Sequence, residues 1–134
     1  MNVFVDTSAF YSVLDADDLL HPAGTSAWLR LLEERGGLHS TSYVLVETMA
    51  LLQRRIGVEG PRTFVAEILP VVQVVWVDEG IHRSAQHALL VASRRDLSLV
   101  DCVSFEAMRR LGLTTAFSFD SHFSEQGFQL LPEA

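Results

Sequence analysis

The chain contains no lysine. Its ten basic residues are all arginines, and 17 acidic residues outnumber them to give a net charge of −7. This balance argues against a protein that coats nucleic acid, because that kind of binding needs many cations to neutralise phosphates. It still allows an enzyme that contacts a few phosphates through a metal ion.

Cysteine is almost absent too, since Cys102 is the only one. An internal disulfide is therefore impossible, and Cys102 is interpreted as a small core residue of an apolar helix rather than a nucleophile. The apolar stretch 71–77 is interrupted by Gln73 and is too short to span a bilayer. No basic segment precedes an apolar one at the N-terminus, so no signal peptide is expected. These absences predict a cytoplasmic protein without membrane contact.

The 134 residues are 49% hydrophobic, which is enough for one domain with one core. No linker or repeat is visible, so residues 1–134 are expected to form a single domain. The expected strands are 2–6, 38–41, 71–77, 114–119 and 128–131, and the expected helices are 8–14, 22–35, 43–56 (capped by Ser42), 60–69, 79–95 and 99–111. Strands that alternate with helices, including the buried runs 3–5 and 71–77, predict an α/β domain with a short, mainly parallel sheet flanked by helices.

Two aspartates directly follow predicted strands. Asp6 ends the first strand, and Asp120 ends the strand at 114–119. A helix cap at Asp6 or Thr7 and an Asx turn at Asp120 would each explain one of these residues locally. However, the carboxyl ends of parallel strands meet at one edge of a sheet, where ligands bind.

Two further acids lie near the starts of predicted helices and have no cation at helical spacing. Glu47 is surrounded by apolar residues, so either its side chain reaches solvent or a metal compensates its charge. Asp101 matches a capping box with Ser98, which is a purely structural alternative. All four acids can converge on one edge of the sheet, and such a cluster requires a cation. Oxygen ligands at a partly open site favour Mg²⁺ or Mn²⁺ over zinc.

The other polar side chains give weaker signals. Arg94 and Arg95 precede the turn that leads to Asp101, where they either approach substrate phosphates or end a solvated helix. The histidines are interpreted as surface or hydrogen-bonded residues, because none shares a helix face with another: His21, His39, His82, His87 and His122.

Large apolar residues are abundant in the first two predicted helices, over residues 9–32. They predict a partner-binding surface that includes Trp28, because exposed apolar patches mark interfaces. Ordinary core packing is the alternative.

Four segments occur in a characteristic order. They are Val-Asp-Thr-Ser-Ala at 5–9, Glu47 in its apolar helix, Leu-Ser-Leu-Val-Asp at 97–101 and Phe-Ser-Phe-Asp-Ser-His-Phe at 117–123. This ordered set, which covers nearly the whole chain, resembles the PIN domain and, within it, the VapC-type toxin ribonucleases of toxin–antitoxin pairs. The resemblance implies a metal site made of Asp6, Glu47, Asp101 and Asp120. It also implies a hydroxyl beside that site from Thr7 or Ser8, and a small polar residue, Ser98, that opens the acid-bearing helix.

The resemblance further implies a Mg²⁺-dependent endoribonuclease that hydrolyses phosphodiester bonds in single-stranded loops of structured RNA through a metal-activated water. It implies a homodimer, and a VapB-type antitoxin whose C-terminal segment blocks the cleft.

Three other functions are compatible with an acidic α/β domain. A receiver-like signalling module would use a lysine near its phosphoacceptor, and the chain has none. A haloacid-dehalogenase-like phosphatase would need a second acid two residues after Asp6, where Ser8 stands. A non-catalytic PIN-like module acting through protein partners would normally have lost some of the four acids.

Overall fold

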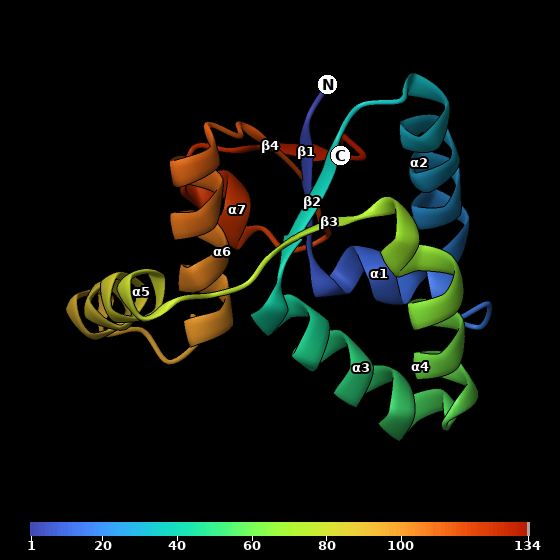
Figure 1. Ribbon diagram of the computed structural model, residues 1–134, viewed down its shortest axis with the longest axis horizontal. Helices are drawn as coiled ribbons and strands as arrows, with labels where there is room; N and C mark the ends of the chain where they lie inside the picture. The colour runs from blue at the N-terminus through green and yellow to red at the C-terminus, as the bar shows by residue number, and fades with distance from the viewer. Residues whose placement is uncertain (134) are drawn as a thin grey trace.

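Five short strands form one sheet at the centre of the structure, a computed structural model that describes residues 1–133 (Figure 1). The strands are β1 (Val3–Val5), β2 (Leu38–Thr41), β3 (Gln73–Val75), β4 (Thr115–Phe117) and β5 (Gln129–Leu131), in the spatial order β3-β2-β1-β4-β5. Every neighbouring pair is parallel. The predicted α/β domain with a mainly parallel sheet is confirmed.

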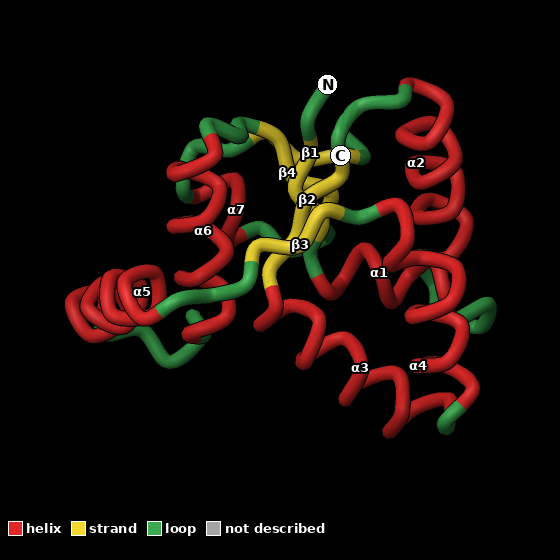
Figure 2. The backbone as a smooth tube through the Cα atoms, viewed as in Figure 1, coloured by secondary structure: helices red, strands yellow, loops and turns green. Residues whose placement is uncertain are grey.

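Helices surround this sheet, as the red segments of Figure 2 show. They are α1 (Thr7–Leu14), α2 (His21–Glu34), α3 (Ser42–Ile56), α4 (Glu59–Thr63), α5 (Glu79–Ala92), α6 (Leu99–Leu111) and α7 (His122–Glu125). In the view of Figure 1, α1, α2 and α4 gather to the right of the sheet, and α5, α6 and α7 to its left. Within residues 1–133, no helix has the length and apolar character needed to cross a membrane.

Strand β1 occupies the middle of the sheet because all three of its residues are apolar. Val3, Phe4 and Val5 are fully buried, as expected for a parallel strand covered on both faces. Phe4 pairs with His39 of β2 on one side and with Ala116 of β4 on the other. The ends of β1 and β4 therefore lie side by side at the carboxyl edge of the sheet.

The prediction of a buried strand over 71–77 is wrong in length and in burial. Strand β3 covers only Gln73–Val75, because a 3₁₀ turn over Leu69–Val71 precedes it. It lies at the edge of the sheet and pairs with β2 alone. Its apolar run is therefore covered incompletely, and Trp76 just beyond it is 74% exposed.

Two predicted helix boundaries also differ from the structure. The cap of α3 is Thr41 rather than Ser42, since the Thr41 hydroxyl accepts the Val44 N–H at 3.2 Å. The Ser42 hydroxyl instead accepts the Val77 N–H at 2.9 Å, which ties α3 to the segment after β3. The predicted helix over 60–69 is α4 followed by a π-helical turn (Phe64–Ile68) and the 3₁₀ turn.

Helix α5 ends at Ala92, three residues earlier than predicted. Ser93 takes a left-handed conformation with a φ of 53°, which stops the helix. As a result, Arg94 and Arg95 belong to the loop before α6 and not to a helix terminus.

Helix α7 was not predicted, because four residues are too few to show a helical period. Its position is set by Phe123, whose side chain is fully buried. The Phe123 ring lies 5.1 Å from that of Phe105 on α6 and 6.2 Å from that of Phe4 on β1, measured between centroids. The start of α7 is therefore fixed by the core.

The first two helices contribute mainly to the core. Trp28 is only 6% exposed, and its ring packs against Phe10, which in turn packs against Phe64. The prediction that Trp28 lies in a partner-binding surface is therefore wrong. On α2 and the preceding loop, the exposed large apolar residues are Leu19, Leu20, Leu29 and Leu32, at 96%, 40%, 54% and 38%.

Replacing Trp28 by alanine should lower the free energy of unfolding by about 3–5 kcal/mol, because it leaves a cavity against Phe10. Leu29→Ala is the matched control on the same helix and should change stability by no more than about 0.5 kcal/mol. Urea denaturation of the two variants measures both values. Equal, small effects would contradict the core position of Trp28.

Candidate metal centre

The carboxyl edge of the sheet brings together three of the four predicted acids. Asp6 follows β1, Asp120 follows β4, and Asp101 lies in the first turn of α6. The Asp6 N–H donates to the Phe117 carbonyl oxygen at 3.1 Å, so the pairing of β1 and β4 continues to the site itself. The convergence expected from parallel strand ends is therefore observed for these acids.

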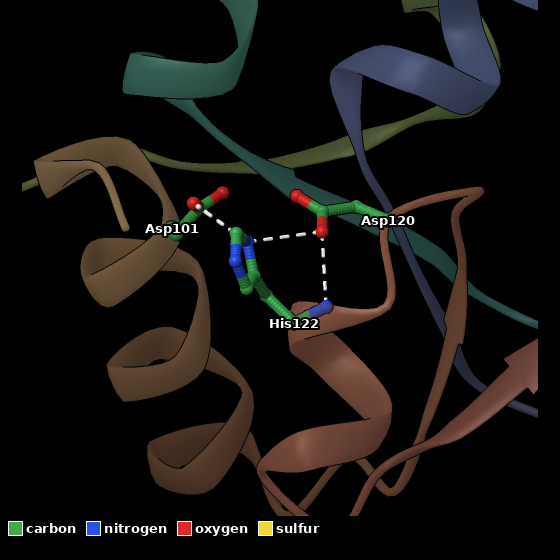
Figure 3. Close-up of side chains that lie close together, drawn as sticks. All are labelled: Asp101, Asp120 and His122. Atoms are coloured by element: carbon green, nitrogen blue, oxygen red, sulfur yellow. Dashed lines mark hydrogen bonds and ion pairs between the residues drawn. The ribbon is translucent and has the colours of Figure 1, made fainter. Parts of the chain in front are cut away.

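Asp101, Asp120 and His122 form the tightest group, which is called the cluster below. One ligand atom from each lies within 4.8 Å of the others. His122 Nδ1 is 3.0 Å from Asp120 Oδ1 and 3.5 Å from Asp101 Oδ2. Figure 3 shows the three side chains pointing toward one another from α6, from the loop after β4 and from the start of α7.

Local hydrogen bonds hold the two aspartates of the cluster in place. The predicted capping box exists: the Ser98 hydroxyl accepts the Asp101 N–H at 3.0 Å, and Asp101 Oδ2 accepts the Ser98 N–H at 3.2 Å. The predicted Asx turn exists as well, since Asp120 Oδ1 accepts the His122 N–H at 2.9 Å. A carboxylate has about four lone-pair sites, so these bonds leave sites on both residues for a cation.

Asp6 is the buried acid of the site, with only 5% of its surface exposed. It stands at the N-cap position of α1, yet its side chain makes no capping hydrogen bond, so the cap alternative does not explain it. Its Oδ2 accepts hydrogen bonds from the hydroxyls of Ser8 at 3.2 Å and Ser118 at 3.1 Å. Ser118 also accepts the Asp120 N–H at 3.0 Å, which couples Asp6 to the cluster.

Burial raises the pKa of Asp6 from 3.8 to about 7. The Thr7 backbone N–H and the Ser118 hydroxyl lower it in part, whereas the nearby charges of Asp101 and Glu47 raise it further. Burial is also the main cause of the raised pKa of Asp101, to which the charge of Asp120 adds. A cation at this edge would reverse both shifts by favouring the ionised forms.

His122 was not expected at the site, and the structure corrects that interpretation. Its side chain is only 15% exposed, and Nδ1 is a buried atom that makes no hydrogen bond. Nδ1 is close enough to Asp120 for one, but its direction does not suit a ring N–H donor. Burial opposes protonation of the ring, yet the carboxylates of Asp96, Asp120 and Asp101 outweigh it and raise the pKa of His122.

Glu47 lies at the rim rather than in the cluster. It is exposed on α3 and lines an open pocket of about 330 Å³ together with Thr7, Ala50, Leu51 and Arg54. Its solvent-reaching position agrees with the alternative stated for it above. Because its charge raises the pKa of Asp6, it nevertheless acts on the same site.

The structure gives the predicted substrate-binding hydroxyls other roles. Thr7 is buried, and its hydroxyl accepts from that of Thr48 at 3.1 Å, which joins α1 to α3. The Ser8 hydroxyl donates to Asp6 and accepts the Phe119 N–H at 2.9 Å. The hydroxyls of Ser8 and Ser98 therefore support the acids, whereas that of Thr7 joins two helices beside the pocket that Glu47 lines.

The two arginines before α6 differ in their surroundings. Arg94 forms ion pairs of 2.8 Å with both Asp96 and Glu125, so its guanidinium already has two carboxylate partners. These partners argue against the predicted role of Arg94 in phosphate binding. Arg95 is exposed and forms no ion pair with any of residues 1–133.

These donors fit a divalent cation. Two carboxylates and an orphaned, buried imidazole nitrogen converge, and a third carboxylate is buried beside them with a raised pKa. Buried polar atoms without partners are rare and call for a ligand or an ion. The Asp-Ser-His sequence at 120–122 was the signal for His122, because an Asx turn brings both side chains to one side.

Comparison with known proteins supports the resemblance to the PIN domain. The family model of the PIN domain matches residues 3–129. The 23S rRNA-specific endonuclease VapC20 of Mycobacterium tuberculosis is 32% identical over 133 residues, which are 98% of this chain and 99% of that protein. The crystal structure of VapC20, described as a sarcin-ricin loop cleaving toxin, matches with a TM-score of 0.83 at 33% identity over 94% of this chain and 95% of that one.

More distant structures share the fold alone. VapBC2 from Rickettsia felis, bound to a DNA fragment from its promoter, matches with a TM-score of 0.70 at 12% identity over 97% of both chains. The chain therefore belongs to the PIN-domain family and, within it, to the VapC-type toxin ribonucleases, which are divalent-metal-dependent hydrolases. The receiver-like and dehalogenase-like alternatives are excluded.

Asp6→Asn should remove a pH dependence of stability from the metal-free protein. Because the folded-state pKa of Asp6 is raised from 3.8 to about 7, its contribution to folding is complete below pH 3.8 and is lost as the pH rises through 7. In wild type, this residue should make the free energy of unfolding fall across that range by up to about 1.4 kcal/mol per pH unit. Urea denaturation in EDTA at a series of pH values measures the slope.

The exposed variant Asp17→Asn is the control and should keep the wild-type slope. An Asp6→Asn protein that also keeps it would show that Asp6 does not titrate as its burial requires.

Proposed function

We propose that this chain is a Mg²⁺-dependent endoribonuclease, the toxin of a VapBC-type pair, and that Asp6, Glu47, Asp101 and Asp120 are its catalytic and metal-binding acids. The observation that supports this most directly is the convergence of Asp6, Asp101 and Asp120 at one sheet edge of a VapC-type PIN domain. Mn²⁺ would serve as a substitute, because it accepts the same hard oxygen ligands.

Within this proposal the acids have distinct tasks. When bound, the divalent cation would polarise a phosphodiester oxygen and activate water for in-line attack on phosphorus. Asp101 and Asp120 would hold the cation, with Asp6 ionised and fixed by the Ser8 and Ser118 hydroxyls behind them. Glu47, exposed at the rim, would complete the site from the side of α3. No side-chain nucleophile is needed, and Cys102 is buried within α6.

The substrate is proposed to be a single-stranded loop in structured RNA. VapC20, at 32% identity over 98% of this chain, is named as a 23S rRNA-specific endonuclease, and its structure is described as that of a sarcin-ricin loop cleaving toxin. Proteins read RNA sequence mainly where bases are unstacked, as in such loops. The large ribosomal RNA is therefore the first substrate to test.

Arg54 is the arginine best placed to contact RNA phosphates near the acids. It lines the same pocket as Glu47, is exposed, and forms no ion pair with any of residues 1–133. In a chain of net charge −7, a cation beside the acidic edge would offset the repulsion that the acids exert on RNA. Arg95 remains a second candidate.

The protein partners are proposed from the family to which the chain belongs. Structures of the same fold include toxin–antitoxin complexes, among them VapBC2 and FitAB bound to DNA fragments. We propose a VapB-type antitoxin that occupies the acidic edge, a homodimeric toxin, and a cytoplasmic location. Residues 1–134 would act as one PIN-like nuclease domain.

Purified protein should cleave 23S rRNA in Mg²⁺, and EDTA should abolish the reaction because the acids alone cannot activate water. Asp101→Asn should abolish cleavage as well, since it removes a cation ligand. The apo variant should be at least as stable as wild type, because asparagine keeps an oxygen for the Ser98 N–H and removes one repelling charge. Primer-extension mapping detects the cut, and thermal unfolding with and without Mg²⁺ reports binding.

Asp17→Asn is the control acid, exposed and remote from the site. Full cleavage in EDTA, by protein free of contaminating nuclease, would rule out the metal-dependent mechanism. A destabilised Asp101→Asn protein that retains the full Mg²⁺-dependent gain would show that Asp101 is only a helix cap.

Arg54→Gln should weaken RNA binding and reduce the slope of log K against log salt by about 0.7, the value expected for one phosphate contact to a single strand. Arg83→Gln is the matched control, because Arg83 is an exposed arginine on α5 that already pairs with Glu79. Binding of catalytically inactive Asp101→Asn protein to a labelled RNA loop, at several salt concentrations, measures both slopes. Identical slopes for the two arginine variants would rule out a phosphate contact by Arg54.

A further inference from the structure

We propose that His122 is a further protein ligand of the divalent cation, bound through Nδ1, and that Asp96 and Arg94 position its ring. The centre would then have mixed nitrogen and oxygen donors instead of carboxylate oxygens alone. This inference rests on the proposed metal-dependent function and extends it to the identity of the ligands.

The first support is the placement of Nδ1. It is buried and without a hydrogen bond, and it lies 3.0 Å and 3.5 Å from oxygens of Asp120 and Asp101. Donors on adjacent corners of an octahedral site with bonds of about 2.1 Å are about 3 Å apart. The two distances from Nδ1 are therefore close to the spacing of neighbouring ligands of one cation.

The second support is the contact made by the other ring nitrogen of His122. His122 Nε2 lies 3.3 Å from Asp96 Oδ2, in hydrogen-bonding geometry. Histidines that bind metals usually donate their other ring N–H to a carboxylate, which fixes the tautomer and the ring orientation. With the proton on Nε2, Nδ1 carries a lone pair that is free to bind a cation beside Asp101 and Asp120.

The carboxylate behind the ring is itself held in place. Arg94 donates to both oxygens of Asp96, from Nε to Oδ1 at 3.1 Å and from Nη2 to Oδ2 at 2.8 Å. A further Arg94 nitrogen donates to Glu125 at 2.8 Å, and Glu125 lies on the same short helix as His122. The series of contacts Glu125–Arg94–Asp96–His122 therefore begins and ends on α7. This arrangement explains why Arg94 pairs with carboxylates of the same chain, although the chain has few basic residues.

A nitrogen donor changes which cations the centre prefers. Imidazole favours the later divalent transition metals, whereas Mg²⁺ prefers oxygen. His122 should therefore increase the affinity for Mn²⁺ relative to Mg²⁺, and its removal should reduce the Mn²⁺ affinity more than the Mg²⁺ affinity.

Pulsed electron paramagnetic resonance of Mn²⁺ bound to the whole protein tests the proposal without any assay of activity. Wild type should show ¹⁴N modulation from one imidazole, and His122→Ala should lose it. His87→Ala, which removes an exposed histidine of α5, should keep it. Absence of ¹⁴N modulation in wild type would overturn the proposal by itself, even where a His122 variant fails to fold.

Asp96→Asn tests the positioning part. It should retain the ¹⁴N signal but lower the Mn²⁺ affinity by about 10-fold or more, the usual effect of losing a carboxylate behind a ligating histidine. Asp17→Asn should leave the affinity unchanged. An Asp96→Asn protein with wild-type affinity would overturn the role of Asp96.

The outcomes also separate this inference from the proposed function. Mn²⁺ binding without ¹⁴N modulation would overturn ligation by His122 and leave a metal site of carboxylates. Failure of wild type to bind Mn²⁺ or Mg²⁺ at all would overturn both proposals.

Discussion

The burial of carboxylates at one sheet edge, together with their mutual repulsion, is the constraint on which the rest of this structure depends. Parallel strand ends and helix starts bring Asp6, Asp101 and Asp120 together, and burial makes the charge of Asp6 costly, so its pKa rises to about 7. Without a cation, such an arrangement persists only because the surrounding structure fixes it. The fold therefore stores an electrostatic strain that a divalent ion would relieve.

Two sets of interactions hold the acids against this repulsion. On one side, Ser118 donates to Asp6 and accepts from the Asp120 backbone, so a single hydroxyl serves both strand ends. On the other side, Arg94 and Asp96 hold the ring of His122 beside Asp101. The first set uses neutral donors and the second uses ions, which suits a site that is buried at Asp6 and more open at Asp101.

Features that depend on neighbouring residues could be predicted from the sequence, whereas those that depend on tertiary position could not. The buried run of β1, the capping box at Asp101 and the turn at Asp120 follow from short-range patterns. The edge position of β3 and the exposure of Glu47 do not follow from such patterns. Apolar neighbours along the chain do not reveal which face of a strand or helix is covered by another element. His122 looked isolated for the same reason, since two of its three acidic partners, Asp101 and Asp96, are 21 and 26 residues away.

The buried Phe123 side chain, which fixes the start of α7, links the proposed metal centre to the rigidity of the core. Phe123 is fully buried between β1 and α6, and the next residue toward the N-terminus is His122. The imidazole is therefore preorganised by van der Waals packing, and little conformational entropy would be lost if it bound an ion as proposed. Conversely, loosening of the contacts of Phe123 with Phe4 and Phe105 on heating would spread the donor atoms apart. Ion affinity at the proposed centre would thus report on local core rigidity, and it would decline before the chain unfolds.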